Sequence, residues 1–291
     1  TLISSDPSKV LASTGGNFSS LDNVTIGSDL TTSGIWNIHN GLDLADGVTL
    51  SASTSRYDFQ GGGTQAVNVL PKPDASPGTA TISLAGGQIN NPVSNQTLIL
   101  GNGLTVNGYG RVGDNSSNAS TLINVGVIDA NVAGQTLGVG HYYSNDAVVN
   151  NGTIKASAGN LGIYSGTITN AGSILASAGT TTLGSSGYTN LVNNTGSIVV
   201  NGGTLVFGPK ETGTTPTWDN NGTLDLQGGT VKFGGFFTPA EVGNFTRAAN
   251  TTVELIGVTD FGGMTLDLAG TDMATGNPFL ADWSTFIATL K

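Results

Sequence analysis

Three aspartates share the local pattern Leu-Asp-Leu and are the first residues whose chemistry needs weighing: Asp43, Asp225 and Asp267. Carboxylates paired on neighbouring strands perform the acid and base steps of glycoside hydrolysis. On a strand, however, each of these aspartates points away from the leucines beside it, and therefore toward solvent. No Asp-Asp or Asp-x-Asp pair occurs in the chain. The pattern favours solvated strand faces, and we predict no catalytic residue and no enzyme.

Two histidines, His39 and His141, are the only imidazoles in a chain that has no cysteine. Transition-metal sites need clustered imidazole or thiolate ligands, so we predict no metal site and no cofactor. His141 is followed directly by Tyr142 and Tyr143. Exposed tyrosine rings stack on sugars or fill a partner's pocket. We therefore name His141, Tyr142 and Tyr143 as candidate binding residues, with a plain surface loop as the alternative.

The charge of the chain excludes two classes of partner. Nine Lys and Arg residues stand against 19 Asp and Glu residues, a formal net charge of −10. Nucleic acids and anionic membrane surfaces are bound through clustered cations, and no two Lys or Arg residues are adjacent here. No apolar run approaches the 18 or more residues of a membrane-spanning helix. We predict neither nucleic-acid binding nor membrane insertion.

The elements that position these residues follow from an internal repeat. Five segments share the pattern Asn-x-Gly followed by a small or β-branched residue and an aliphatic one, and their glycines are separated by 26, 20, 24 and 26 residues. Such a period is typical of solenoid proteins, in which each repeat is one structural unit. We take the following residues as repeat anchors: Gly126, Gly152, Gly172, Gly196, Gly222, Asn150, Asn170, Asn194 and Asn220.

Alternation within the repeats indicates short strands. In the segment 222–226, Leu224 and Leu226 face one side, and Thr223 and Asp225 face the other. One repeat buries too little apolar surface to fold alone, whereas stacked repeats share a core and pair their strands. We expect glycine and asparagine to provide left-handed backbone at the corners, and the asparagines to stack into an amide ladder. A β-sandwich or a propeller is the competing architecture.

We therefore predict an all-β fold, a parallel β-helix solenoid with a short C-terminal helix. Glycine at 45 of 291 residues and a charged fraction of 10% agree with many tight turns and few helices. Residues 1–94 are expected to form irregular coils, with an excursion near 53–79 because Pro71, Pro73 and Pro77 cluster there. Residues 95–270 are expected to form the regular repeats, and 271–291 a capping or assembly segment.

Two helical signals stand out from the strands. Thr238, Pro239 and Glu241 occupy the cap, first and third positions of a capping box, which predicts one short helical turn. After Asp282, apolar residues recur with helical spacing, which predicts a helix over 282–291 that covers an open coil and serves assembly. Its apolar stripe consists of Trp283, Phe286, Ile287 and Leu290.

The segment Asn-Gly-Thr-Ile-Lys-Ala at 151–156, followed by Gly-Asn-Leu-Gly-Ile at 159–163, resembles the repeats of bacterial autotransporter passengers and filamentous-haemagglutinin-type adhesins. The resemblance covers about residues 95–270. It implies a right-handed parallel β-helix, export from the cell, and a role at the cell surface or in a matrix. The chain is shorter than that family's proteins and has no recognisable translocator barrel.

These observations converge on an extracellular structural solenoid of a bacterial surface fibre or biofilm matrix. We expect it to be secreted or displayed at the cell surface and to form homo-oligomers or filaments through end or edge contacts. One alternative is an adhesin segment that binds surface glycans through residues 141–146 or 53–79. A second alternative is a polysaccharide lyase or hydrolase built on a β-helix.

Overall fold

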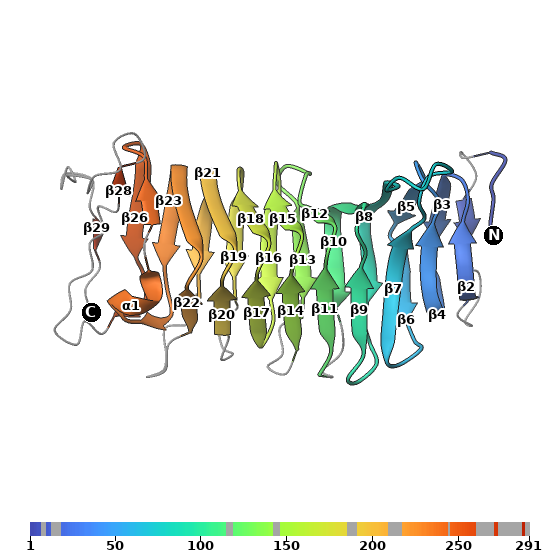
Figure 1. The fold of residues 1–291 in the computed structure, drawn as a ribbon, viewed down its shortest axis with the longest axis horizontal. Helices are drawn as coiled ribbons and strands as arrows, with labels where there is room; N and C mark the ends of the chain where they lie inside the picture. Colours follow the sequence, from blue (N-terminus) through green and yellow to red (C-terminus); the bar gives the residue numbers. More distant parts are fainter. Residues whose placement is uncertain are drawn as a thin grey trace.

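The computed structural model describes residues 1–6, 10–12, 19–114, 119–141, 146–184, 191–208, 217–243, 245–259, 271–272 and 287–288. They form an all-β parallel solenoid of about nine turns, an elongated rod with the strands across its long axis (Figure 1). The predicted fold class is thereby confirmed. The right-handed sense implied by the family resemblance stays a prediction.

Three rows of parallel strands run along the rod, and we call them the first, second and third faces. Each turn passes through the three faces in that order, so a strand pairs with its counterparts in the preceding and following turns. The first face contains β1 (Val10–Ala12), β3 (Leu30–Ser33), β5 (Thr49–Ser53), β8 (Ala80–Asn90), β10 (Leu104–Asp114), β12 (Val127–Asp129), β15 (Thr153–Ala156), β18 (Ser173–Ala176), β21 (Ser197–Phe207), β23 (Thr223–Phe233), β25 (Phe245–Arg247) and β28 (Thr271–Asp272).

Four of these strands, β8, β10, β21 and β23, continue into the second face. Each bends at a shift in pairing register, or between the residues that pair with one strand and those that pair with another. The second face also contains β2 (Ser19–Ile26), β4 (Ile35–Leu44), β6 (Arg56–Phe59), β13 (Thr136–Gly140), β16 (Asn160–Tyr164), β19 (Thr180–Leu183), β26 (Thr251–Leu255) and β29 (Ile287–Ala288). The third face begins with the ends of β2 and β4 and continues through β7 (Thr64–Val69), β9 (Thr97–Leu100), β11 (Thr121–Asn124), β14 (Ala147–Asn150), β17 (Thr167–Asn170), β20 (Leu191–Asn194) and β22 (Trp218–Asn220). Strands β24 (Phe236–Phe237) and β27 (Val258–Thr259) form a separate parallel pair.

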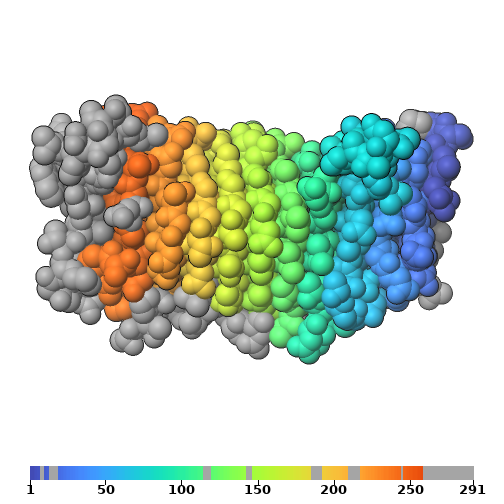
Figure 2. Space-filling model, viewed as in Figure 1, coloured from blue at the N-terminus to red at the C-terminus, as the bar shows by residue number. Residues whose placement is uncertain are grey.

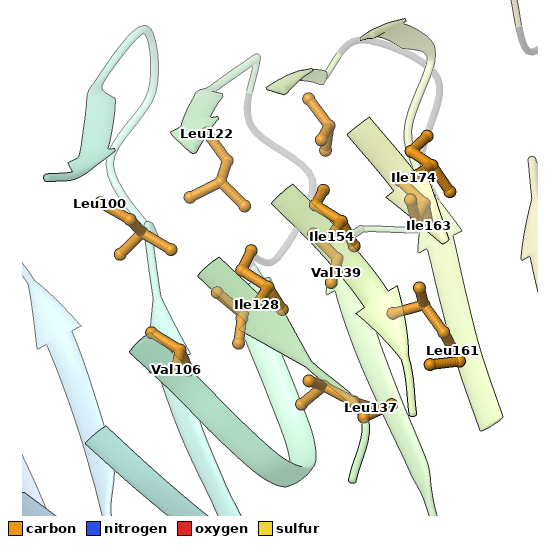
Figure 3. Close-up of a cluster of buried hydrophobic side chains, with 14 of the residues drawn as sticks. Leu100, Val106, Leu122, Ile128, Leu137, Val139, Ile154, Leu161, Ile163 and Ile174 are labelled. Carbon is orange, nitrogen blue, oxygen red and sulfur yellow. The ribbon is translucent and has the colours of Figure 1, made fainter. Parts of the chain in front are cut away.

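Side-chain alternation builds one continuous apolar interior. In β15, β18 and β21 the register pairs Ile154 with Ile174 and Ile174 with Ile198, and all three are fully buried. Aliphatic residues of successive turns therefore stack on one another along the inside of the rod (Figure 3). Because each turn contributes only a few such residues, its hydrophobic stabilisation depends on the turns above and below.

The repeat asparagines form the predicted amide ladder at the end of the third face. Each Nδ2 atom donates to the Oδ1 atom of the next asparagine, at 2.8 Å from Asn124 to Asn150 and at 2.7 Å for each later step through Asn170, Asn194 and Asn220. All five side chains are buried. The last amide, of Asn220, donates to the carbonyl oxygen of Val242 at 2.9 Å, so the ladder ends on the short helix.

The repeat glycines stack directly above one another, two residues after the asparagines. A methyl group at Gly152, Gly172, Gly196 or Gly222 would lie 2.1–2.2 Å from the carbonyl oxygen of the anchor glycine in the preceding turn. The backbone of these anchor glycines is not left-handed, whereas the expected left-handed backbone does occur in other turns, for example at Gly47, Asn95 and Gly103. Glycine is required at the anchors because the backbones of successive turns approach too closely for a Cβ atom.

The excursion predicted near 53–79 is shorter than expected. Strands β6 and β7 lie within that range and pair normally with β4, β8 and β9. Only residues 70–79, which hold the three prolines, leave the coil; Figure 2 shows this part as a cyan bulge. Its tip is a tight turn, because Asp74 accepts hydrogen bonds from the amide and hydroxyl of Ser76. The same bonds lower the pKa of Asp74.

One helical prediction is confirmed and the other is corrected. Helix α1 (Pro239–Val242) begins at Thr238 with the expected capping box, in which Glu241 accepts from the backbone amide of Thr238 at 2.6 Å. In the predicted helix at 282–291, the described residues Ile287 and Ala288 instead form β29, which pairs with β26. The unpaired edge of β26 offers backbone donors and acceptors to an added segment, and residues 287 and 288 pair with it. Trp283, Phe286 and Leu290 lie outside the described residues.

Helix α1 has four residues, so no helix in the described part of the chain is long enough to cross a membrane.

A buried tyrosine is expected to make the free energy of unfolding of the rod depend on pH in the alkaline range. Tyr57 is 2% exposed, and its hydroxyl is hydrogen-bonded to Thr32, which also contacts Ser55 at 2.9 Å. Burial raises the pKa of Tyr57 to about 12, whereas an unfolded tyrosine has a pKa near 10. Below pH 10 both states keep the proton. Between about pH 10 and 12 the unfolded state loses it first, so the free energy of unfolding falls.

We expect Tyr57 to contribute a loss of about 2–3 kcal/mol by pH 12. Urea unfolding at intervals from pH 8 to 11.5 measures it, with Tyr57→Phe as the comparison. The phenylalanine variant starts about 1 kcal/mol less stable at neutral pH, since Thr32 and Ser55 lose a partner, but declines less steeply above pH 10. If the free energy of unfolding falls equally with pH in the two proteins above pH 10, the prediction is contradicted.

Candidate functional site: a groove between Arg111 and Tyr164

The second face carries a hollow on its outer surface over three consecutive turns. In β10, β13 and β16 the register places Arg111 beside Gly138 and Gly138 beside Gly162. The neighbouring residues Val112, Leu137 and Val139 are buried inside the rod, so this row points outward. Two successive glycines leave the middle of the row without side chains.

Tyr164 and Arg111 form the two walls of the hollow. A methyl group at residue 162 would lie 2.1 Å from both Cζ and the hydroxyl oxygen of Tyr164, so the tyrosine ring lies across Gly162. A methyl group at residue 138 would lie 3.9 Å from Cε2 of Tyr164 and 3.9 Å from Cγ of Arg111. Gly138 therefore forms a floor that is open to solvent between a ring and an arginine stem.

The resulting groove has a volume of about 380 Å³. Its lining consists of Gly110, Arg111, Thr136, Gly138, Gly140 and Tyr164. The same outward row is filled in later turns, where Thr182, Val206 and Lys232 follow Gly162 in register. Lys232 makes an ion pair with Glu254 at 2.8 Å. The groove is thus a local feature of the three turns from β10 to β16.

The arrangement combines three groups that recognise small polar ligands. An aromatic ring offers a face for stacking, a guanidinium offers a fork of donors, and a glycine floor leaves backbone groups accessible. The groove's volume lies within the range of small-molecule sites. The described residues of its lining include one cation and no carboxylate.

One of the candidate binding residues predicted from sequence, His141, lies next to this groove. His141 follows the lining residue Gly140 at the end of β13 and is 8% exposed. Tyr142 and Tyr143 lie outside the described residues. Asp146, at the other end of that segment, is buried and accepts from the amide of Ser120 at 2.9 Å.

Two aspartates of the Leu-Asp-Leu segments, Asp43 and Asp225, are held by amides and a hydroxyl group. Asp43 accepts from the Asn68 amide at 3.0 Å. Asp225 accepts from Gln227 and Thr246 beside a second hollow of about 470 Å³. Asp267 lies outside the described residues. Within the described ranges, no three histidine or carboxylate side chains gather where they could hold a metal ion.

Sequence reasoning missed Arg111 and Tyr164. A signal was nevertheless present, because Gly138 and Gly162 stand at outward strand positions where other repeats have threonine, valine or lysine. Glycine at such a position marks a close approach of other atoms or a gap in the surface. To recognise this signal one must know which residues of successive turns pair with each other. Loops of unequal length hide that register in the sequence.

No protein-family model, no curated protein and no solved structure matches this chain.

Proposed function

We propose that the chain is a structural, non-enzymatic solenoid that works outside the cell in a bacterial surface fibre or biofilm matrix. The observation that carries the proposal is the unbroken amide ladder from Asn124 to Asn220, with the glycine stack beside it. Together the ladder and the glycine stack keep successive turns aligned with one another. A rod with a constant cross-section suits a mechanical spacer, and the repeats resemble those of bacterial surface adhesins.

Assembly is proposed to use the strand edges at the ends of the rod. Among the described residues, β1 pairs on one side only, with β3. An unpaired strand edge is a template for a strand from another chain. Contacts of one end with a different surface form open filaments when the rotation between copies does not close. A second copy joined at this edge would extend the same parallel stack.

The proposal predicts concentration-dependent polymers that depend on the edge of β1. Val10 is 53% exposed on that edge, and Val10→Lys places a charge where a second strand would pair. We expect light scattering and electron microscopy to show polymers of the unmodified protein and a several-fold lower polymer fraction for Val10→Lys. Val125→Lys is the control, because Val125 is also exposed but lies in the middle of the rod. A monomer at every concentration contradicts assembly, and equal loss in both variants contradicts the role of β1.

A second candidate function, recognition of a surface glycan, is favoured by the groove. Tyr164 and Arg111 are the residue types that stack on sugar rings and bond to their polar groups. Both functions are compatible in one molecule, since the groove lies on the side of the rod and the proposed assembly edge lies at its end.

A further inference from the structure

We propose that helix α1 blocks the outer edge of β22 and thereby prevents a second copy of the chain from pairing with the third face. This inference rests on the proposed function, assembly through strand edges, and adds where such assembly is closed. The first and second faces continue past β23 with β25 and β26. On the third face the element that follows β22 is α1, which lies against it (Figure 1). Among the described residues, β22 pairs on one side only, with β20.

Two groups of Asn220 would serve a further strand if the third face continued. In each earlier turn, the carbonyl oxygen of the ladder asparagine accepts from a backbone amide of the following turn, and in the last such bond Asn221 donates to Asn194 at 2.8 Å. The side-chain amide of each of these asparagines donates to the next one. The carbonyl oxygen and the side-chain amide of Asn220 are therefore the groups with which another strand would pair.

Helix α1 covers both of these groups. The carbonyl oxygen of Val242 accepts from the Asn220 amide at 2.9 Å. A methyl group at Gly243 would lie 2.3 Å from the carbonyl oxygen of Asn220, so the backbone that ends the helix lies directly against that oxygen. Gly243 has a φ of 65°, which glycine adopts without strain. A strand from another chain could reach Asn220 only after α1 had moved.

The position of α1 depends on its contacts with the rod, because four residues are too few for a helix that is stable alone. Val242 is fully buried, and the capping box of Thr238 and Glu241 fixes the start of the helix. Ala240, on the same helix, is exposed to solvent. A charge at Val242 should therefore release the helix from β22, whereas the same charge at Ala240 should leave it in place.

Size-exclusion chromatography with light scattering tests the inference on the whole chain in a Val10→Lys background, where the edge of β1 is blocked. We expect Val10→Lys alone to be mainly monomeric. Adding Val242→Asp should raise the dimer fraction about tenfold at equal concentration, because each copy then presents the same opened edge of β22. Replacement of residues 238–243 by a flexible Gly-Ser segment of the same length should have the same effect. At low concentration, hydrogen exchange in the peptide that contains β22 should be faster in both opened variants.

Ala240→Asp and Val242→Ile are the matched controls, and both should behave like Val10→Lys alone. The first adds the same charge on the solvent side of α1, and the second keeps the apolar contact. Circular dichroism checks that the variants are folded, and the Gly-Ser replacement decides if Val242→Asp is not. Dimers in Ala240→Asp overturn the role of the α1 contact.

The opened variants separate this inference from the proposed function. If they stay monomeric, α1 does not prevent pairing at β22 and the inference is overturned, whatever the unmodified protein does. If hydrogen exchange at β22 is unchanged in them, α1 does not cover that edge, which overturns the inference as well. A monomeric unmodified protein together with dimeric opened variants contradicts assembly through β1 but supports the block at β22.

Discussion

Gly172→Ala is expected to destabilise the rod by about 3 kcal/mol, near the upper end of overpacking effects. The added methyl group would lie 2.1 Å from the carbonyl oxygen of Gly152 and 2.8 Å from the carbonyl carbon of Asn151. Both are backbone atoms, so no rotamer change relieves the contact. The turns would have to separate, which weakens the bond of 2.8 Å from the Ser173 amide to the Gly152 oxygen.

Denaturant unfolding followed by circular dichroism measures the loss, and Gly138→Ala is the matched control. A methyl group at Gly138 meets no atom closer than 3.7 Å, and its backbone is not left-handed. We expect that variant to lie within about 0.5 kcal/mol of the unmodified protein. A small effect of Gly172→Ala, comparable to that of Gly138→Ala, would show that the turns are not stacked as closely as described.

Asn170→Ala is expected to cost about 3 kcal/mol, because it interrupts the amide ladder in the middle. The Asn170 amide accepts from Asn150 at 2.7 Å and donates to Asn194 at 2.7 Å and to the Ser197 carbonyl at 3.2 Å. Its side chain is fully buried. Removal leaves polar atoms on both neighbouring turns without a partner and water cannot replace it without entering the core. Thermal and denaturant unfolding measure the effect.

Two further variants distinguish the loss of the ladder hydrogen bonds from other causes of destabilisation. Asn193→Ala changes a neighbouring residue that is not in the ladder, and we expect at most about 0.5 kcal/mol. Asn170→Asp keeps the shape but places a carboxylate against the Oδ1 atom of Asn194. Repulsion and burial raise the pKa of that new carboxyl group, so the variant should regain stability as the pH falls and the proton supplies the missing donor. Equal losses at residues 170 and 193 would contradict a special role for the ladder.

The repeat architecture could be predicted from particular residues. The Asn-x-Gly anchors predict stacked turns, and the ladder from Asn124 to Asn220 confirms them, because identical residues at equivalent positions align when strands pair in parallel. The capping box at Thr238 is equally local, and α1 begins where it predicts. These features depend on contacts between equivalent positions of neighbouring repeats, or on contacts within one short segment. The pattern that produces them is therefore visible in the sequence.

Three features were not foreseen correctly from the sequence, namely the role of the anchor glycines, the extent of the excursion and the state of the C-terminal segment, because each depends on neighbouring turns. The anchor glycines serve close approach between backbones, which no single repeat reveals. Strands β6 and β7, within residues 53–69, pair with adjacent turns, although the prolines that follow break the period. Ile287 and Ala288 join a strand edge in place of the helix that their spacing favours, since β26 offers partners for the backbone.

The sequence by itself determined the class of fold and the interior ladder, since both follow from residue types recurring along the chain. Only the tertiary structure decided that Arg111, Gly138 and Gly162 share one outward row, with Tyr164 across it. The reason is physical: successive anchors are 20–26 residues apart, and the loops absorb the difference. Which outward residues become neighbours is therefore set by hydrogen-bond register between turns, which distance along the chain does not specify.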